Sequence, residues 1–161
     1  MEAFSDPTVV TFAKLLLAAF LGIALGTERA VMAKQTAGSR TFGLVALGSC
    51  LFVLTGFAIN SEFIGLVNFD PSRVLAAVVQ GIGFLGAGLI IFRNDQLHGV
   101  TTAAGLWVAA AVGGVVAFGM YSVAIYATIL TLIIFYGMWY VENCFKRWFD
   151  QKMDENAGPN V

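Results

Sequence analysis

Five stretches of this chain are long and apolar enough to cross a lipid bilayer, and this feature limits what the chain can fold into. A helix needs roughly 20 apolar residues to span the hydrocarbon core, and inside lipid it satisfies its own backbone hydrogen bonds. The predicted spans are Val9–Thr27, Phe42–Ile59, Val74–Phe92, Thr101–Phe118 and Tyr121–Val141. We therefore predict an all-α membrane protein, a compact bundle of five transmembrane helices.

The composition agrees with a membrane environment and argues against several other classes of protein. Apolar residues make up 58% of the chain and charged residues 12%, against roughly 45–50% and 25% in soluble domains. With a net charge of −1, the chain offers no basic face for nucleic acid. Cys50 and Cys144 stand apart in the sequence, so we expect neither a disulfide framework nor a metal site. We also expect no cofactor. No nucleophile is accompanied by a base and an orienting group, so an enzyme is not expected.

The distribution of lysine and arginine predicts the orientation. An outer N-terminus puts seven of the nine Lys and Arg residues on the cytoplasmic side, as the positive-inside rule favours. Only Gly119 and Met120 separate the last two spans, which leaves a tight hairpin or a less regular connection open. If these two spans formed a single crossing, four Lys and Arg residues would lie on the cytoplasmic side and five outside. We predict an outer segment over 1–8, a transmembrane domain over 9–141, and a cytoplasmic interfacial and flexible tail over 142–161.

Local signals predict where two helices begin. The pairs Asp6-Pro7 and Asp70-Pro71 are typical of an N-cap carboxylate followed by proline at the first helical position. Lys14 lies a little over one turn inside the first span, and we expect it to snorkel outward.

Small residues at four-residue spacing predict how the helices pack. Helices in lipid associate through close backbone contact over glycine, alanine and serine. The predicted packing glycines are Gly22, Gly26, Gly81, Gly83, Gly86, Gly88, Gly105 and Gly113. A substrate path along these glycines is the alternative. We also expect the small-residue faces of spans one and four to be open to partners.

Polar residues near the predicted cytoplasmic ends of the spans are candidate functional residues, because charge is costly in the membrane. We predict a polar cluster that binds an ion, a lipid headgroup or a partner protein; its members are Glu28, Arg29, Arg40, Thr41, Arg93, Thr101 and Thr102. The alternative is that Glu28 pairs with an arginine (Arg40 if the ends of spans one and two meet), Arg93 snorkels and the threonines cap a helix. Asp70 and Arg73 form the outer-side motif.

Four motifs, in order and spacing, resemble the MgtC/SapB family of membrane proteins. Residues 26–29 match G-x-E-R and residues 37–41 match A-G-x-R-T. The D-P-S-R segment at 70–73 leads to the glycine run at 81–88, and residues 98–107 resemble R-G-L-T-T-A-A-x-L-W. Departures from the family pattern are Ala77, where many members have glutamine, and His98 and Val100, which replace arginine and leucine. The chain also ends near the fifth span, so we expect the soluble C-terminal domain of many members to be missing.

The resemblance implies a bacterial inner-membrane protein linked to magnesium homeostasis, stress response and virulence. It further implies regulation of partner membrane proteins, ATP synthase among them, by a family once described as magnesium transporters.

Two hypotheses of function follow, with a purely structural or lipid-scaffolding role as a third. The first is a regulatory membrane protein that acts through helix contacts with partners or with a second copy, as a homodimer. The alternative is a small Mg²⁺ transporter or channel, suggested by Glu28, Asp70 and the glycine-lined third span. A buried polar chain from Asp70 past Gln80 to Glu28 would favour transport, and a structure without it would count against transport.

Overall fold

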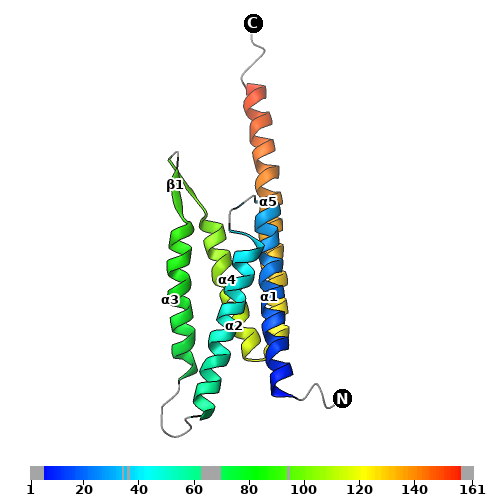
Figure 1. Ribbon diagram of the computed structural model, residues 1–161. Coiled ribbons are helices and arrows are strands. Elements are labelled where there is room, and N and C mark those ends of the chain that lie inside the picture. The colour runs from blue at the N-terminus through cyan, green and yellow to red at the C-terminus, as the bar shows by residue number, and fades with distance from the viewer. Residues whose placement is uncertain (1–5, 34, 36, 63–69, 94, 157–161) are drawn as a thin grey trace.

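The computed structural model describes residues 6–33, 35, 37–62, 70–93 and 95–156, apart from the side chains at 61, 62, 142 and 146–156. Five helices alternate in direction along a common axis, and a small hairpin joins the third to the fourth (Figure 1). The elements are α1 (Pro7–Val31), α2 (Ser39–Glu62), α3 (Pro71–Leu89), β1 (Ile91–Arg93), β2 (Gln96–His98), α4 (Val100–Ala117) and α5 (Tyr121–Asn156). Residues 1–5 and 157–161, which belong to the predicted outer segment and tail, lie outside the described part.

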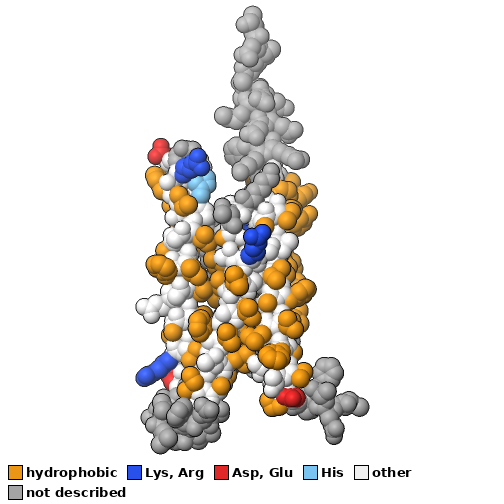
Figure 2. Space-filling view, in the orientation of Figure 1, with side chains coloured by type: hydrophobic (Ala, Val, Ile, Leu, Met, Phe, Trp, Pro, Cys, Tyr) orange, Lys and Arg blue, Asp and Glu red, His pale blue; other side chains and the backbone are white. Residues whose placement is uncertain are grey.

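Within the described residues, five helices are long and apolar enough to cross a membrane, which confirms that prediction. Apolar side chains cover the lateral surface, and charged side chains gather towards the two ends (Figure 2). We refer to the end that carries β1 and β2 as the hairpin end, and to the end where α3 begins as the Asp70 end. The helix α5 continues to Asn156, well beyond Val141, where the predicted span ends.

The hairpin departs from the all-α prediction. The helix α3 ends at Leu89 rather than Phe92, and Ile90 already has extended dihedral angles. The strands pair antiparallel, with Arg93 opposite Gln96, and Asp95 in their connection has φ 58°. Aspartate tolerates this left-handed conformation, and β-branched and aromatic residues before it favour a strand. The apolar run therefore continues past the end of the helix.

Two predicted N-caps are present. The Asp6 carboxylate accepts a hydrogen bond from the Thr8 backbone N–H at 2.8 Å, and the Asp70 carboxylate accepts one from Ser72 at 2.9 Å. In both helices proline follows the cap and needs no hydrogen-bond acceptor. The Asp-Pro pairs therefore fix where α1 and α3 begin, as the sequence predicts.

The connection between α4 and α5 is a tight hairpin built on one glycine. Gly119 has φ 78°, its N–H donates to the Val116 carbonyl, and the Met120 N–H donates to the Val115 carbonyl. This pair of bonds is the Schellman motif, which needs a left-handed residue and closes a helix. The two-residue link therefore reverses the chain fully and makes α4 and α5 separate crossings.

Glycines bring α1 and α2 into backbone contact. A Cβ atom at Gly22 would lie 2.6 Å from the backbone oxygen of Phe42, and one at Gly26 would lie 2.6 Å from that of Gly38. Gly43 of α2 reciprocates, because a Cβ there would lie 2.7 Å from the Ile23 side chain. A side chain at Gly22 or Gly26 would force the two helices apart, whereas one at Gly43 would first displace the Ile23 side chain.

The helix α4 is the most buried of the five and packs against all the others. At Gly105 an added Cβ would lie 2.8 Å from the Phe135 ring, and at Gly113 it would collide with the backbone of Ala46. The small-residue faces of α1 and α4 are therefore filled within the chain, which corrects the expectation that they are open to partners.

Lys14 of α1 stabilises the end of α4. Its ammonium donates a hydrogen bond to the Ala117 carbonyl at 2.9 Å, and a cation at this position stabilises the helix C-terminus.

The helix α3 is the least buried span and leans mainly on α4. Its glycines differ from those of α1 and α4. A Cβ at Gly86 would meet Ala103 at an ordinary 3.6 Å, whereas Gly81, Gly83 and Gly88 face nothing within 4 Å. The packing role predicted for these three is not used inside the described chain.

We predict opposite effects of alanine at a packed and at an open glycine. Gly113→Ala should destabilise the fold by about 1–3 kcal/mol, since overpacked sites must shift backbone. Gly137→Ala, at a helical position with no atom within 4 Å, should be neutral or stabilising by up to about 1 kcal/mol. Thermal unfolding of both variants in detergent measures the difference. Equal melting temperatures would contradict the α2–α4 contact.

Candidate functional site

An ion pair lies at the hairpin end of α1. The Arg29 Nε donates to a carboxylate oxygen of Glu28, and each side chain is 8% exposed. Burial makes such a pair costly to separate, because removing either partner leaves an uncompensated charge. Glu28 therefore pairs with its neighbour in sequence, while Arg40, the other arginine considered for it, is exposed.

The guanidinium of Arg29 also contacts α5. It stacks over the Phe135 ring at 3.9 Å from the ring centre, within the range of a cation–π interaction. Phe135 in turn lies against Gly105 of α4. This arrangement joins the charged end of α1 to α4 and α5 through one aromatic ring.

One oxygen of the pair lacks a donor. Glu28 Oε1 is buried and accepts no hydrogen bond from the described residues. An unsatisfied buried oxygen costs about 1–3 kcal/mol, and more when it is charged. The atom would therefore be stabilised by a hydrogen bond from a water molecule, by protonation or by a bound cation.

Among the described residues, no hydrogen bond or ion pair joins the remaining members of the predicted polar cluster to this pair. Thr101 is exposed at the start of α4, whereas Thr102 beside it is 3% exposed. Thr41 lines a groove between α2 and α3, and Arg93 lies in β1. The structure thus divides the cluster into the Glu28–Arg29 pair, a group at the hairpin with Arg93 and Thr102, and separate surface residues.

The Asp70 end carries the other predicted motif. The pKa of Asp70 lies below its usual value because the Ser72 side chain and backbone N–H stabilise the carboxylate, with a smaller contribution from Arg73. Both Asp70 and Arg73 are exposed. Their roles in the structure are to cap α3 and to place a cation at this end.

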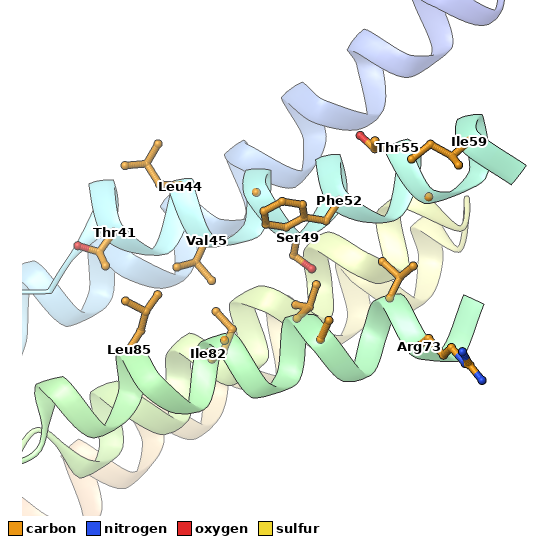
Figure 3. Close-up of a pocket in the computed structure, with 16 residues that line it drawn as sticks. Thr41, Leu44, Val45, Ser49, Phe52, Thr55, Ile59, Arg73, Ile82 and Leu85 are labelled. Atoms are coloured by element: carbon orange, nitrogen blue, oxygen red, sulfur yellow. The ribbon is translucent and has the colours of Figure 1, made fainter. Parts of the chain in front are cut away.

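An apolar groove of about 930 Å³ separates α2 from α3 (Figure 3). Leu44 and Phe52 lie on one wall and Ile82 and Leu85 on the other, with Arg73 at one end and directed outward. The Ser49 hydroxyl in the wall already donates to the Ala110 carbonyl at 2.7 Å. The groove therefore offers an apolar surface rather than a polar binding site.

The outward face of α3 carries a polar side chain in the middle of the span. Ala76, Gln80, Gly83 and Ala87 follow one another at helical spacing, so they share one face, and none of them lines the grooves beside α3. The Gln80 side chain is exposed and has no hydrogen-bond partner among the described residues. Gln80 is the tenth of the 19 residues of α3.

Two parts of these sites escaped the sequence analysis. Phe135 carried no signal, because one aromatic residue in an apolar span does not show which cation it meets. The hairpin did carry one: Asn94-Asp95 between Phe92 and Leu97 is a turn signal between apolar residues.

Charged ends, an apolar lateral surface and five long helices define a multi-pass α-helical membrane protein. In the described part, no three His, Cys, Asp or Glu side chains are grouped as a metal site would require.

The chain belongs to the MgtC family, whose profile matches residues 15–144. It is 45% identical over 126 residues to YhiD of Escherichia coli (strain K12), named as a proposed magnesium transporter, covering 75% of this chain and 57% of YhiD. It is 38% identical over 118 residues to Protein MgtC of Salmonella typhimurium (strain LT2), covering 73% and 48%. Protein SrpB of Synechococcus elongatus is 36% identical over 132 residues, with 77% and 72% covered.

This chain spans about half of the length of MgtC and somewhat more of YhiD. The family match over residues 15–144 includes most of the five long apolar helices of this chain. No solved structure matches the chain significantly.

We predict non-additive effects at the ion pair. Arg29→Met should cost about 3–5 kcal/mol, because it leaves the Glu28 carboxylate buried and unpaired. The double variant Glu28→Gln with Arg29→Met should lose less stability than the sum of the two single variants.

Thermal unfolding of the three variants in detergent measures this coupling. Arg40→Met is the control: at an exposed arginine it should change stability by no more than about 0.5 kcal/mol. Additive losses would show that the two side chains do not act as a pair.

Proposed function

We propose that this protein is a non-enzymatic regulator in the bacterial inner membrane that acts through contacts of α3 with another membrane helix. The observation that carries this proposal is Gln80, an exposed amide in the middle of a span that has no hydrogen-bond partner within the described part of the chain. In lipid such an amide gains stability from a partner helix, and the neighbouring small residues allow close approach. The partner is a second copy of the chain or another membrane protein.

The proposal includes an orientation. Arg29, Arg40 and Arg93 lie at the hairpin end, whereas Arg73 and the amino end of α1 lie at the other. The positive-inside rule then directs the hairpin end to the cytoplasm. This orientation gives an outer N-terminus and a cytoplasmic C-terminus.

A link to magnesium is supported by family membership and by the name that YhiD carries. We extend that link to this chain as part of the proposal, together with a role in stress response and virulence. A regulator of this kind would change the activity of its partner when magnesium is scarce.

Transport of Mg²⁺ is the second candidate, and one observation favours it: the unsatisfied Oε1 of Glu28. One observation on the structure and one property of the ion speak against it. Gln80 faces outward rather than towards a path between Asp70 and Glu28, and Mg²⁺ sheds its water only reluctantly and needs oxygen ligands. We therefore place transport second.

A photo-crosslinking residue at position 87, on the Gln80 face, tests the regulatory proposal in native membranes. We expect an adduct with one defined partner, either the chain itself or another membrane protein. Gln80→Met, which keeps the length of the side chain but removes the amide, should reduce the adduct about tenfold if roughly 1–2 kcal/mol is lost.

The matched control places the same crosslinker at position 16, an exposed position on α1. An adduct there of equal yield, or one at position 87 that Gln80→Met leaves unchanged, would refute the α3 contact. Magnesium flux in proteoliposomes that Glu28→Gln abolishes, with the variant shown to be folded, would instead establish transport.

A further inference from the structure

A cavity of about 370 Å³ lies at the hairpin end, separate from the Gln80 face. Its walls come from the hairpin, the first turn of α4 and the connection between α1 and α2, and its size is within the range of small-ligand sites. The polar residues that line it are Gln35, Arg93, His98 and Thr102. Among the described residues, no carboxylate lines it.

The strand geometry explains why the basic side chains face this cavity. Successive side chains of a strand point to opposite faces. Ile91, Arg93 and His98, which is paired with Ile91, share the cavity face, whereas Phe92 and Leu97 are paired on the other. In the space-filling view a Lys or Arg side chain lies beside the histidine at this corner of the molecule, with an acidic side chain at its tip (Figure 2).

The start of α4 adds backbone donors. Gly99 precedes the helix with φ 88° and provides no side-chain cap, and the N–H groups of Val100, Thr101 and Thr102 have no acceptor in the described chain. A Cβ at Gly99 would collide with the Leu89 carbonyl, so a capping side chain has no room there. Free amides and the helix dipole make such an end favourable for an anion.

Thr102 independently points to a ligand. Its side chain is 3% exposed and lines the cavity, yet its hydroxyl has no hydrogen-bond partner among the described residues. Five threonines in the helices, in contrast, donate their hydroxyl to the carbonyl four residues earlier; they are Thr11, Thr27, Thr55, Thr128 and Thr131. For Thr102 the carbonyl four residues earlier belongs to His98, which lies in the hairpin, so the hydroxyl does not make this hydrogen bond.

We propose that this cavity binds a phosphate group. Arg93 supplies a permanent positive charge, His98 donates an N–H in either protonation state, and the Thr102 hydroxyl and the first amides of α4 complete the donors. The group is carried either by free phosphate or by an acidic phospholipid, because the cavity lies at the end of the spans, where headgroups lie. This site is independent of the proposed α3 contact.

Two probes distinguish the sources. The first is inorganic phosphate, measured by equilibrium dialysis against the full chain in an uncharged detergent. The second is phosphatidate in phosphatidylcholine nanodiscs, counted on the protein by native mass spectrometry. Saturable binding of inorganic phosphate identifies a free-phosphate site, and retention of phosphatidate alone identifies a lipid site; both support the proposal.

Variants separate the site from general surface charge. Arg93→Gln should weaken binding of the probe about tenfold or more, as expected when a charge-assisted hydrogen bond is lost. Thr102→Val, which keeps the shape but removes the hydroxyl, should weaken it severalfold, and Thr102→Ser should retain it. Arg40→Gln, at an exposed arginine that does not line the cavity, should leave binding unchanged.

Absence of binding of both probes would overturn the proposal. So would equal losses in Arg93→Gln and Arg40→Gln, or a Thr102→Val variant that binds as tightly as the original chain. If Arg93→Gln fails to fold, the comparison of Thr102→Val with Thr102→Ser still decides, because these two changes leave the hairpin intact.

Discussion

Backbone contact at glycine is the constraint on which the rest of the structure depends. Inside lipid, apolar side chains gain little by moving from lipid onto another helix, because both surroundings are apolar, so helices are held together by close packing. Gly22 and Gly26 bring α1 onto α2, and Gly113 brings α4 onto the same helix. These three helices form the part against which α3 and α5 are placed. The position of the Glu28–Arg29 pair depends on that packing, because Phe135 reaches the guanidinium across Gly105.

The same constraint divides the molecule into a filled part and an open part. Where glycines meet backbone, no surface remains for a partner. Gly81, Gly83 and Gly88 meet nothing within 4 Å in the described chain, so the small-residue surface of α3 stays open there. The cost of charge in lipid acts alongside this division: Lys14 and Arg29 both reach partners on other elements, a carbonyl of α4 and a ring of α5.

Much of the fold could be predicted because its signals are local. Hydrophobic length identified the five spans, and Asp-Pro pairs identified two helix starts. The hairpin was missed because Ile90, Ile91 and Phe92 continue the apolar run of α3, and strands of three residues show almost no periodicity. The glycines could not be divided into packed and open sets, since their spacing is the same in α1 and α3. Which arginine pairs with Glu28 could not be predicted, because adjacent residues on a helix do not ordinarily face each other and the sequence does not show that Phe135 contacts Arg29.

The length of α5 makes the two membrane surfaces unequal. Its 36 residues extend about 54 Å at 1.5 Å per residue, whereas the hydrocarbon core is roughly 30 Å thick. Beginning at a tight turn with α4, the helix has its surplus on the hairpin side alone. Among the described residues no helix projects far past the others at the Asp70 end, whereas at the hairpin end α5 projects as a helical post (Figure 1). A large protein approaching along the membrane normal on that side meets this post before it reaches the bilayer, whereas ions and lipid headgroups pass beside it.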